Sequence, residues 1–360
     1  MDKIITNILE KIENKGFEAY LVGGYVRDYL LGIKSFDVDI CTSALPKDLH
    51  KIFPNNHNSN TYGGFNLKIK KYNIDITTFR KELKYEKRKP IEIIYIDSLE
   101  EDIKRRDFTI NTICMDKNEK VIDFLNGIDD LNNRKIRMID NIDVRLQEDP
   151  LRILRAIRFA SILNFKIDDE LDKKIKNNYK LVSKLSLERI KQELNKILLD
   201  KNFINGLYLL KEYKILDLLD ITYNEIKYVN DICGMWAQLE TNKNYAFTKQ
   251  ELFNIINIRH IVNGGFIDNK ILYKYGLYIS LVSAEILDIP VKKIHQMYNK
   301  LPIKSLNDLN ITSEEIINIL NINPSKKIKE IKNELVDKIL DKKLNNETSE
   351  LRKYLLQRKE

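Results

Sequence analysis

The sequence has few of the residues that build metal clusters and disulfide frameworks, and it has no long apolar run. Its three cysteines, Cys41, Cys114 and Cys233, are far apart and form no Cys-x-x-Cys pair, which argues against a zinc site or a secreted disulfide scaffold. The four histidines include no His-Glu-x-x-His motif, so a histidine-based metal hydrolase lacks support. No apolar run approaches the roughly 20 residues of a membrane span, and no signal peptide is visible. We therefore expect a cytoplasmic protein with reduced thiols, in which any metal has oxygen ligands.

Length and charge set the next limits. The chain has 360 residues, more than one typical core contains, so we expect two or more subdomains. Its 61 Lys and Arg against 53 Asp and Glu give a net charge of +8, which favours a polyanionic partner. An AT-rich genome would enrich Lys, Asn and Ile in the same way, so the charge supports such a partner without establishing it.

The hydrophobic pattern divides the chain into a mixed part and a helical part. Residues 1–140 alternate helical and strand patterns, and two period-2 runs within residues 63–79 predict a hairpin. The polar segment 80–90 is expected to be a mobile loop, followed by a helix over 98–106 and another over 108–115. Beyond this part, Leu and Ile spacings of three and four predict helices almost to the end.

Two aspartates stand at alternate positions of an apolar strand in the segment FDVDI. Side chains at i and i+2 share one face of a strand, so Asp37 and Asp39 point the same way, while Phe36, Val38 and Ile40 point into the core. Paired carboxylates repel each other unless water screens them or a cation binds, and oxygen-only ligands on a rigid strand suit Mg²⁺. An isolated Asp-x-Asp is most often a solvated face. The neighbouring segments therefore decide its interpretation.

The preceding segment, LVGGYVRDYLL, predicts a strand-to-helix turn. Gly23 and Gly24 let the backbone approach an anion, and the helix N-terminus presents free N–H groups. Arg27 adds a guanidinium suited to phosphate oxygens. A phosphate cradle beside paired carboxylates is what phosphoryl transfer requires, because that chemistry is mostly positioning and charge neutralisation. A tight turn and an Arg27–Asp28 surface pair are the plainer alternatives.

Two further segments are rich in arginine. Arg105 and Arg106 end a predicted helix, and Asp107 is a candidate N-cap for the next one. From the residues alone we interpret these three as groups that complement helix termini. Proximity to the aspartate pair would reverse that preference.

The segment EDPLRILRAIRFASIL predicts a helix that is buried nearly all round and yet contains Arg152, Arg155 and Arg158. Buried guanidinium groups need partners, and Asp149 can serve at most one or two of them. A bound nucleotide would satisfy the rest, with Asp149 and Arg152 at a base edge and the later arginines on phosphate or on structural carboxylates. An internal salt-bridge network is the alternative.

Seven segments together resemble the class II tRNA nucleotidyltransferases, which are the CCA-adding enzymes, and their bacterial poly(A) polymerase relatives. They follow the family's order: LVGGYVRDYLLG, FDVDICTSA, DITTFRKE, RRDFTINT, GIDDLNNRKIR, EDPLRILRAIRFA and LSLERIKQEL. The C-terminal segment LVDKILDKKLNNETSELRKYL is similar to that of the family as well, so the resemblance covers nearly the whole chain.

The resemblance implies an α+β fold class for the N-terminal part. It implies a nucleotidyltransferase head with a mixed sheet flanked by helices, like the palm of DNA polymerase beta, followed by an all-α neck, body and tail. The corresponding residues are 1–140 for the head, 141–205 for the neck, 206–285 for the body and 286–360 for the tail. The body and tail would hold the acceptor end of tRNA.

The resemblance also implies a role for each candidate site residue. Asp37 and Asp39 would bind catalytic Mg²⁺, and Asp75 matches a third carboxylate that could assist the 3′-hydroxyl. The nucleotide-binding residues would be Gly24, Arg27 and Arg106 at the triphosphate, Asp149 and Arg152 at the base, and Arg155 and Arg158 around the pocket.

The implied activity is template-independent addition of C, C and A to the 3′ end of tRNA from CTP and ATP, with release of pyrophosphate. No membrane and no obligate protein partner is implied. Three alternatives stay open: a relative that adds only CC, only A or a poly(A) tail; a catalytically silent RNA-binding protein; and a nucleotidyltransferase that modifies small molecules. Residues 80–90 match the flexible loop that CC-only members lack, which favours the complete activity.

Overall fold

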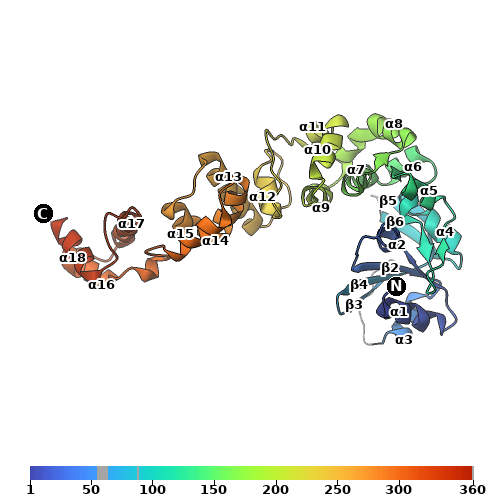
Figure 1. Ribbon diagram of the computed structural model, residues 1–360, viewed down its shortest axis with the longest axis horizontal. Helices are drawn as coiled ribbons and strands as arrows, with labels where there is room; N and C mark the ends of the chain where they lie inside the picture. Colours follow the sequence, from blue (N-terminus) through green and yellow to red (C-terminus); the bar gives the residue numbers. More distant parts are fainter. Residues whose placement is uncertain (55–63, 87–88, 359–360) are drawn as a thin grey trace. The chain divides into compact units, whose positions relative to one another are not determined.

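The computed structural model describes residues 1–54, 64–86 and 89–358, and it divides into two compact units, Met1–Leu219 and Asp220–Glu360 (Figure 1). The first unit contains strands and helices, and the described part of the second is helical apart from an isolated bridge between Thr222 and Glu240. The mixed head sheet and the helical remainder are therefore confirmed. The finer division into head, neck, body and tail stays a prediction.

A six-stranded mixed sheet forms the framework of the first unit, in the order β3-β4-β2-β1-β7-β8. Its strands are β1 (Ala19–Val22), β2 (Asp37–Thr42), β3 (Gly64–Ile69), β4 (Tyr72–Thr78), β7 (Cys114–Met115) and β8 (Val121–Ile122). β2 pairs in parallel with β4 and antiparallel with β1, and β3 and β4 form the predicted hairpin. β2 is thus held by neighbours on both sides.

The side chains of β2 alternate between two environments. Val38 and Ile40 are fully buried, whereas Asp37 and Asp39 lie on the opposite face. The prediction for Phe36 was wrong, because this side chain is 39% exposed and packs beside Tyr72 instead of entering the core. Phe36 precedes the first residue of the strand, so the alternation that governs β2 does not extend to it.

Helices cover the sheet and position its loops. They are α1 (Lys3–Glu13), α2 (Gly23–Leu30), α3 (Pro46–Ile52) and α4 (Leu99–Lys104). Asp2 is the N-cap of α1, and its carboxylate accepts a hydrogen bond from the Ile4 N–H. The stripe of buried aliphatic residues on α1 packs against the sheet. α2 starts directly where β1 ends, so the Gly23–Gly24 pair lies at the edge of the β2 face.

Two predictions about residues 80–115 were wrong. Instead of a loop, the segment after β4 forms an antiparallel hairpin of β5 (Arg80–Glu86) and β6 (Lys89–Tyr95). Its base is held by Asp102, which is fully buried and accepts a hydrogen bond from the Arg80 N–H. The expected helix over 108–115 is only a 3-10 turn, η1 (Thr109–Asn111), because the chain then extends into β7 and pairs with β1.

The rest of the first unit is mainly helical. Its elements are α5 (Gly127–Asn132), α6 (Ile142–Glu148), α7 (Leu151–Leu163), α8 (Asp169–Asn178), η2 (Tyr179–Lys184), α9 (Leu187–Leu198), α10 (Phe203–Glu212), α11 (Ile215–Leu219) and the short parallel strands β9 (Lys135–Ile136) and β10 (Lys166–Ile167). α7 is the central helix and packs against both α9 and α10. A Cβ at Gly206 of α10 would collide with the side chain of Ile197, so glycine permits this close approach.

The second unit is built from helices around an aliphatic core. Its elements are α12 (Ile232–Ala237), α13 (Lys249–Gly264), α14 (Asn269–Ile286), α15 (Val291–Asn299), η3 (Leu306–Asp308), α16 (Ser313–Leu320), α17 (Lys326–Leu340) and α18 (Thr348–Gln357). α14 is interrupted at Gly276, where φ is 75°. Leu335 and Leu351 are fully buried members of the core shared by α17 and α18.

Two further features bear on the sequence-based expectations. Cys41, Cys114 and Cys233 are all free thiols and all buried. Within the described ranges, no helix combines the length and the apolar character required to cross a lipid bilayer.

Candidate active site

A polar cavity of about 550 Å³ lies in the first unit, between α2, β2, the end of α4 and α7. Nine of the ten site residues predicted from the sequence line this cavity: Gly24, Arg27, Asp37, Asp39, Arg106, Asp149, Arg152, Arg155 and Arg158. The tenth, Asp75, lies on the neighbouring strand β4. The fold therefore brings together residues from segments that are far apart in the chain.

Gly23 sets the contact between α2 and the aspartate pair. Its φ is +73°, a left-handed conformation that L residues with side chains rarely adopt. A Cβ at this position would lie 2.7 Å from the Asp39 Oδ2 atom, so any other residue would displace that carboxylate. The next residue, Gly24, donates a backbone hydrogen bond to Asp39. The glycine pair thus fixes the start of α2 against the Asp39 side chain.

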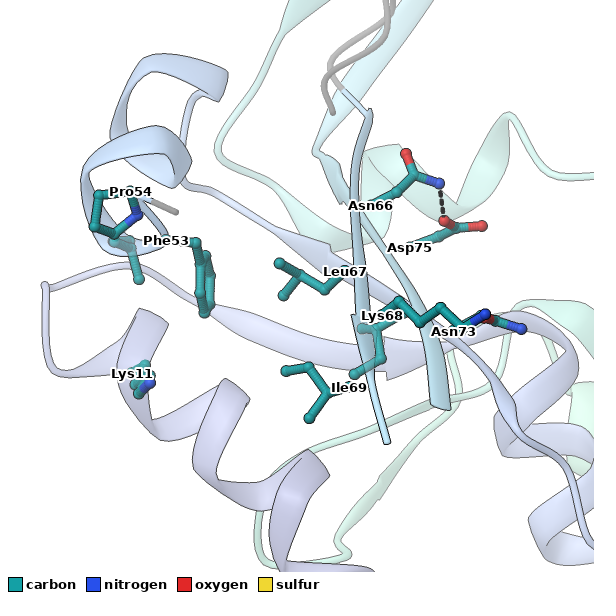
Figure 2. Close-up of a pocket in the computed structure, with 11 residues that line it drawn as sticks. Lys11, Phe53, Pro54, Asn66, Leu67, Lys68, Ile69, Asn73 and Asp75 are labelled. Atoms are coloured by element: carbon teal, nitrogen blue, oxygen red, sulfur yellow. Dashed lines mark hydrogen bonds between the residues drawn. The ribbon is translucent and has the colours of Figure 1, made fainter. Parts of the chain in front are cut away.

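Three carboxylates share the open face of the sheet. Asp39 lies opposite Asp75 in the parallel pairing of β2 with β4, and Asp37 is two residues before Asp39. Asn73 Nδ2 donates to Asp37 Oδ1 at 2.9 Å, and Asn66 donates to Asp75 (Figure 2). Two of the three acidic groups are therefore oriented by asparagines of the β3–β4 hairpin.

The pKa values of these carboxyls reflect burial and mutual repulsion. Burial raises the pKa of Asp39, Arg106 opposes that effect, and the negative charges of Asp75 and Asp37 raise it further. The pKa of Asp75 is raised by burial and by Asp37. A cation among these groups would remove the repulsion, so the site is chemically suited to one.

Asp37 and Asp39 offer oxygen ligands of the kind that a hard divalent cation takes. Across the described part of the chain, no three or more His, Cys, Asp or Glu side chains form a metal-binding group by themselves. Hard divalent cations such as Mg²⁺ are often held by one or two carboxylates, with water and substrate phosphates completing the shell. Asp37 and Asp39 could supply the protein ligands of such a site.

Arg27 carries positive charge on the α2 side of the cavity. It is 7% exposed, and its Nε and Nη2 atoms donate to Asp28 Oδ1 at 2.8 and 2.6 Å. Its Nη1 donates to Asn111 Oδ1 at 2.8 Å. These bonds fix the plane of the guanidinium and use three of its five N–H groups, so two remain available to an anion.

Arg105 is the C-cap residue of α4, and both Arg105 and Arg106 also line the cavity, so their proximity to the aspartate pair favours a role at the site. Both pair with the buried Asp102, at 2.9 and 3.4 Å. The Nε atom of Arg106 is buried and has no hydrogen-bond partner among the described residues. Arg106 also lies close enough to Asp39 to affect its pKa. It therefore places positive charge near the aspartate pair.

Asp107 is not the N-cap that was predicted. Phe108 precedes η1, and Asp107 accepts hydrogen bonds from Asn111 at 3.1 Å and from Arg155 Nε at 2.7 Å. Burial by itself would raise the pKa of Asp107, but Arg155 and the hydrogen bond from Asn111 lower it to about 2. Asp107 is thus an ionised anchor for α7.

Each of the three α7 arginines has a carboxylate partner of its own. Arg152 pairs with Glu148 at 3.2 Å, Arg155 with Asp107 at 2.5 Å and Arg158 with Glu193 at 2.7 Å. The internal network that was left open as an alternative is therefore present, and the same arginines still face the cavity. The two interpretations are compatible, because each guanidinium has more donors than one carboxylate accepts.

Sequence reasoning missed four residues that contact the predicted ones: Asn111, Glu148, Phe159 and Glu193. It named Asp107, but as a helix cap. Asp107, Asn111 and Phe159 also line the cavity. Asn111, Phe159 and Glu193 all occur in the segments RRDFTINT, EDPLRILRAIRFA and LSLERIKQEL, which carried the resemblance. Their presence in these segments was the signal from which sequence reasoning could have identified them.

Three segments of the chain match models of known protein families. Residues 19–137 match the poly A polymerase head domain, residues 164–220 match a family described as the probable RNA and SrmB-binding site of polymerase A, and residues 224–355 match tRNA nucleotidyltransferase domain 2. These matches together cover most of the chain.

Whole-chain relatives carry one common description. The chain is 34% identical to the CCA-adding enzyme of Ligilactobacillus salivarius over 92% of its own length and 91% of the relative's. It is 33% identical to that of Lactococcus lactis, over 94% and 92%. Among solved structures, the Bacillus stearothermophilus CCA-adding enzyme in complex with CTP matches 99% of this chain and 98% of that chain, with 26% identity and a TM-score of 0.88.

Proposed function

The chain belongs to the CCA-adding enzymes, and from this premise we propose that its cavity transfers nucleotides from CTP and ATP, one at a time, to the 3′ end of tRNA. The observation that carries the proposal is the convergence of the Asp37–Asp39 pair, the glycine turn and the α7 arginines on one cavity. Carboxylates that suit a divalent cation, donors that suit phosphates and side chains that suit a base edge are the three parts that untemplated nucleotidyl transfer needs.

The triphosphate is held by Gly24, Arg27 and Arg106. The two N–H groups of Arg27 that the internal bonds leave over and the guanidinium of Arg106, which lines the cavity, supply the donors. Asp37 and Asp39 hold Mg²⁺, which when bound lowers the proton affinity of the attacking hydroxyl and offsets charge on the leaving pyrophosphate. Burial and, to a smaller extent, the neighbouring carboxylates raise the pKa of Asp39, and this supports the assignment because a bound cation would stabilise the ionised form.

The acceptor end reaches the reaction from the β3–β4 side. The phosphate donors lie on the α2 side of β2, and in-line transfer places the attacking hydroxyl opposite the leaving group. Asp75 lies on β4 and shares a second cavity with Asn66, Lys68 and Asn73 (Figure 2). The raised pKa of Asp75 makes it a better proton acceptor, and the exposed Lys68 suits a backbone phosphate of the acceptor strand.

Asp149 and Arg152 select the base, and Arg155 and Arg158 complete the nucleotide pocket. A carboxylate beside a guanidinium can accept from an exocyclic amine and donate to a ring acceptor at the same base edge. Their place at the start of α7, within the cavity, supports this role. Protein side chains would then choose between CTP and ATP without a nucleic-acid template. We further propose that the body and tail, residues 206–285 and 286–360, hold the acceptor end of tRNA.

The test is nucleotide incorporation into tRNA transcripts that end before, within and after the terminal CCA. With Mg²⁺, CTP and ATP, we expect the two truncated forms to be extended to CCA and the complete form to stay unextended. Asp37→Asn and Asp39→Asn serve as matched inactive variants. If the truncated tRNAs stay unextended and no pyrophosphate is released, the catalytic proposal fails, and an RNA-binding role without catalysis takes its place.

A relative with partial activity is the second candidate. Single-nucleotide reactions separate the cases, because a CC-adding enzyme stops after two cytidines and an A-adding enzyme requires a substrate that already ends in CC. Repeated addition of A to unrelated RNA would indicate a poly(A) polymerase.

A further inference from the structure

Three guanidinium groups surround one buried phenyl ring at the cavity. The guanidinium carbons of Arg158, Arg27 and Arg155 lie 4.2, 5.0 and 5.4 Å from the centroid of the Phe159 ring. Phe159 is 7% exposed and lines the cavity together with all three arginines. Every one of these distances is within the range in which a cation is attracted to the face of an aromatic ring.

Carboxylates neutralise the three arginines, but none pairs with all of them. Arg27 pairs with Asp28 of its own helix, Arg155 with Asp107 and Arg158 with Glu193. Asn111 links two of the three, because it accepts from Arg27 and donates to Asp107, but this chain of hydrogen bonds does not include Arg158. The aromatic ring is what the three have in common. Its negative face attracts each cation and offsets part of their mutual repulsion, which an aliphatic side chain of similar volume would not do.

The contact with Arg27 is the informative one. Arg155 lies four residues before Phe159 on α7, so helix geometry brings it near the ring, and Arg158 is the residue directly before Phe159. Arg27 comes from α2, a helix far earlier in the chain. The ring therefore joins the helix that carries the phosphate donors to the helix that carries the base-selecting residues. Phe108 packs edge-on against it, with ring centroids 5.7 Å apart and planes at 81°.

We propose that Phe159 is a positioning residue of the nucleotide site, and that it acts through cation–π attraction on Arg27, Arg155 and Arg158. Its ring keeps the phosphate-side and base-side arginines in one arrangement before the nucleotide arrives. The ring itself does no chemistry. This inference rests on the proposed function, because it assigns the cavity to a nucleoside triphosphate.

The decisive test lowers the electron density of the ring in steps while its shape stays nearly the same. Phenylalanine with one, two or three fluorine atoms is incorporated at position 159, and the dissociation constants of CTP and ATP are measured by calorimetry on the full-length protein. Fluorine weakens the negative face stepwise, so we expect the dissociation constants to rise in order, to about tenfold for the trifluoro ring. If the ring acts only by packing, the dissociation constants should show no such order, because fluorination leaves the packing nearly unchanged.

Two conventional substitutions accompany the series. Phe159→Leu keeps an apolar side chain and removes the ring, and we expect weaker binding of CTP and ATP by about tenfold or more. Phe165→Leu is the matched control, because Phe165 closely follows α7 and is similarly buried at 8%. The control is expected to lose stability to a comparable degree while its nucleotide affinity stays within about twofold. Thermal unfolding of each variant verifies that it is folded.

The outcomes separate this inference from the function on which it rests. If unmodified protein binds neither CTP nor ATP, the proposed function is wrong. If it binds both and the fluorinated series shows the same affinity throughout, the cation–π role of Phe159 is wrong while the function stands. An ordered loss of affinity with unchanged thermal stability supports the proposal, and Phe159→Tyr, which keeps a ring, should recover most of the affinity lost in Phe159→Leu.

Discussion

Asp39 and Asp75 lie directly opposite each other on the parallel strands β2 and β4, and the charge of Asp75 raises the pKa of Asp39. Burial is the larger cause of that shift. In the absence of a cation, the arrangement therefore costs folding free energy that a fold selected for stability alone would avoid. Residues held at such a cost are common at functional sites. The first two predictions concern Asp39 and the cation that would offset this cost.

Asp39→Asn is expected to abolish activity and to stabilise the protein. The pKa of Asp39 in the folded protein is raised above its ordinary value of 3.8, so the ionised form destabilises the fold at neutral pH. That cost disappears as the pH falls through the raised pKa. The melting temperature of the variant should exceed that of the wild type by about 1–3 °C at pH 7, and the difference should shrink toward pH 4. A variant that melts below the wild type at pH 7 would contradict this account.

Mg²⁺ is expected to raise the melting temperature of the wild-type protein. A ligand that binds only the folded state stabilises it by about 1.4 kcal/mol at ten times its dissociation constant. The stabilisation should be lost in Asp37→Asn and Asp39→Asn, which keep the shape of the side chain and remove its charge. Differential scanning fluorimetry with and without EDTA provides the measurement. Equal stabilisation of all three proteins would place the cation elsewhere.

Gly23→Ala is expected to reduce activity far more than it reduces stability. The new Cβ would lie 2.7 Å from Asp39 Oδ2, and the residue has a φ of +73°. Gly32→Ala is the matched control, since Gly32 has a φ of +70° and a methyl group added there would have nothing within 4 Å. Both should lose about 1–2 kcal/mol from backbone strain. Only Gly23→Ala should lose nucleotide incorporation, by about a hundredfold, and equal losses would show that backbone strain is the sole cause.

Asp107→Asn is expected to destabilise the first unit and to loosen α7. The pKa of Asp107 is about 2 in the folded protein, against an ordinary value of 3.8. A depressed carboxyl pKa contributes stability that is fully present above the unfolded pKa and is lost as the pH falls toward 2, and this difference corresponds to about 2 kcal/mol. Chemical denaturation at pH 7 should reveal the loss, and the difference between variant and wild type should narrow below pH 4. An unchanged midpoint would mean that the Arg155–Asp107 pair adds nothing net.

Local regularities explain which parts of the site could be predicted from sequence. The shared face of Asp37 and Asp39 follows from the two-residue period of a strand, and the burial of Val38 and Ile40 follows from the same period. The turn at Gly23 and Gly24 was predicted because glycine adopts backbone conformations that other residues avoid. The role of Arg106 at the triphosphate came from the resemblance, whereas a place for Asp149 at a base edge was inferred from the buried arginines that follow it.

The errors have a common physical cause, which is tertiary contact. The segment RKELKYE has five charged residues among its seven, so it resembles a solvated loop, yet Asp102 anchors its first residue from 22 positions away. Residues 108–115 were expected to be helical, but pairing with β1 extends their second half. In the same way, spacing showed that the α7 arginines need partners, and only the fold shows that Asp107 and Glu193 provide them.

The burial of every native thiol has a practical consequence for following this protein at work. Because Cys41, Cys114 and Cys233 are enclosed, maleimide dyes should react only with cysteines introduced by mutation. One such label in Met1–Leu219 and another in Asp220–Glu360 would allow single-molecule energy transfer to record the separation of the two units during each cycle of RNA growth.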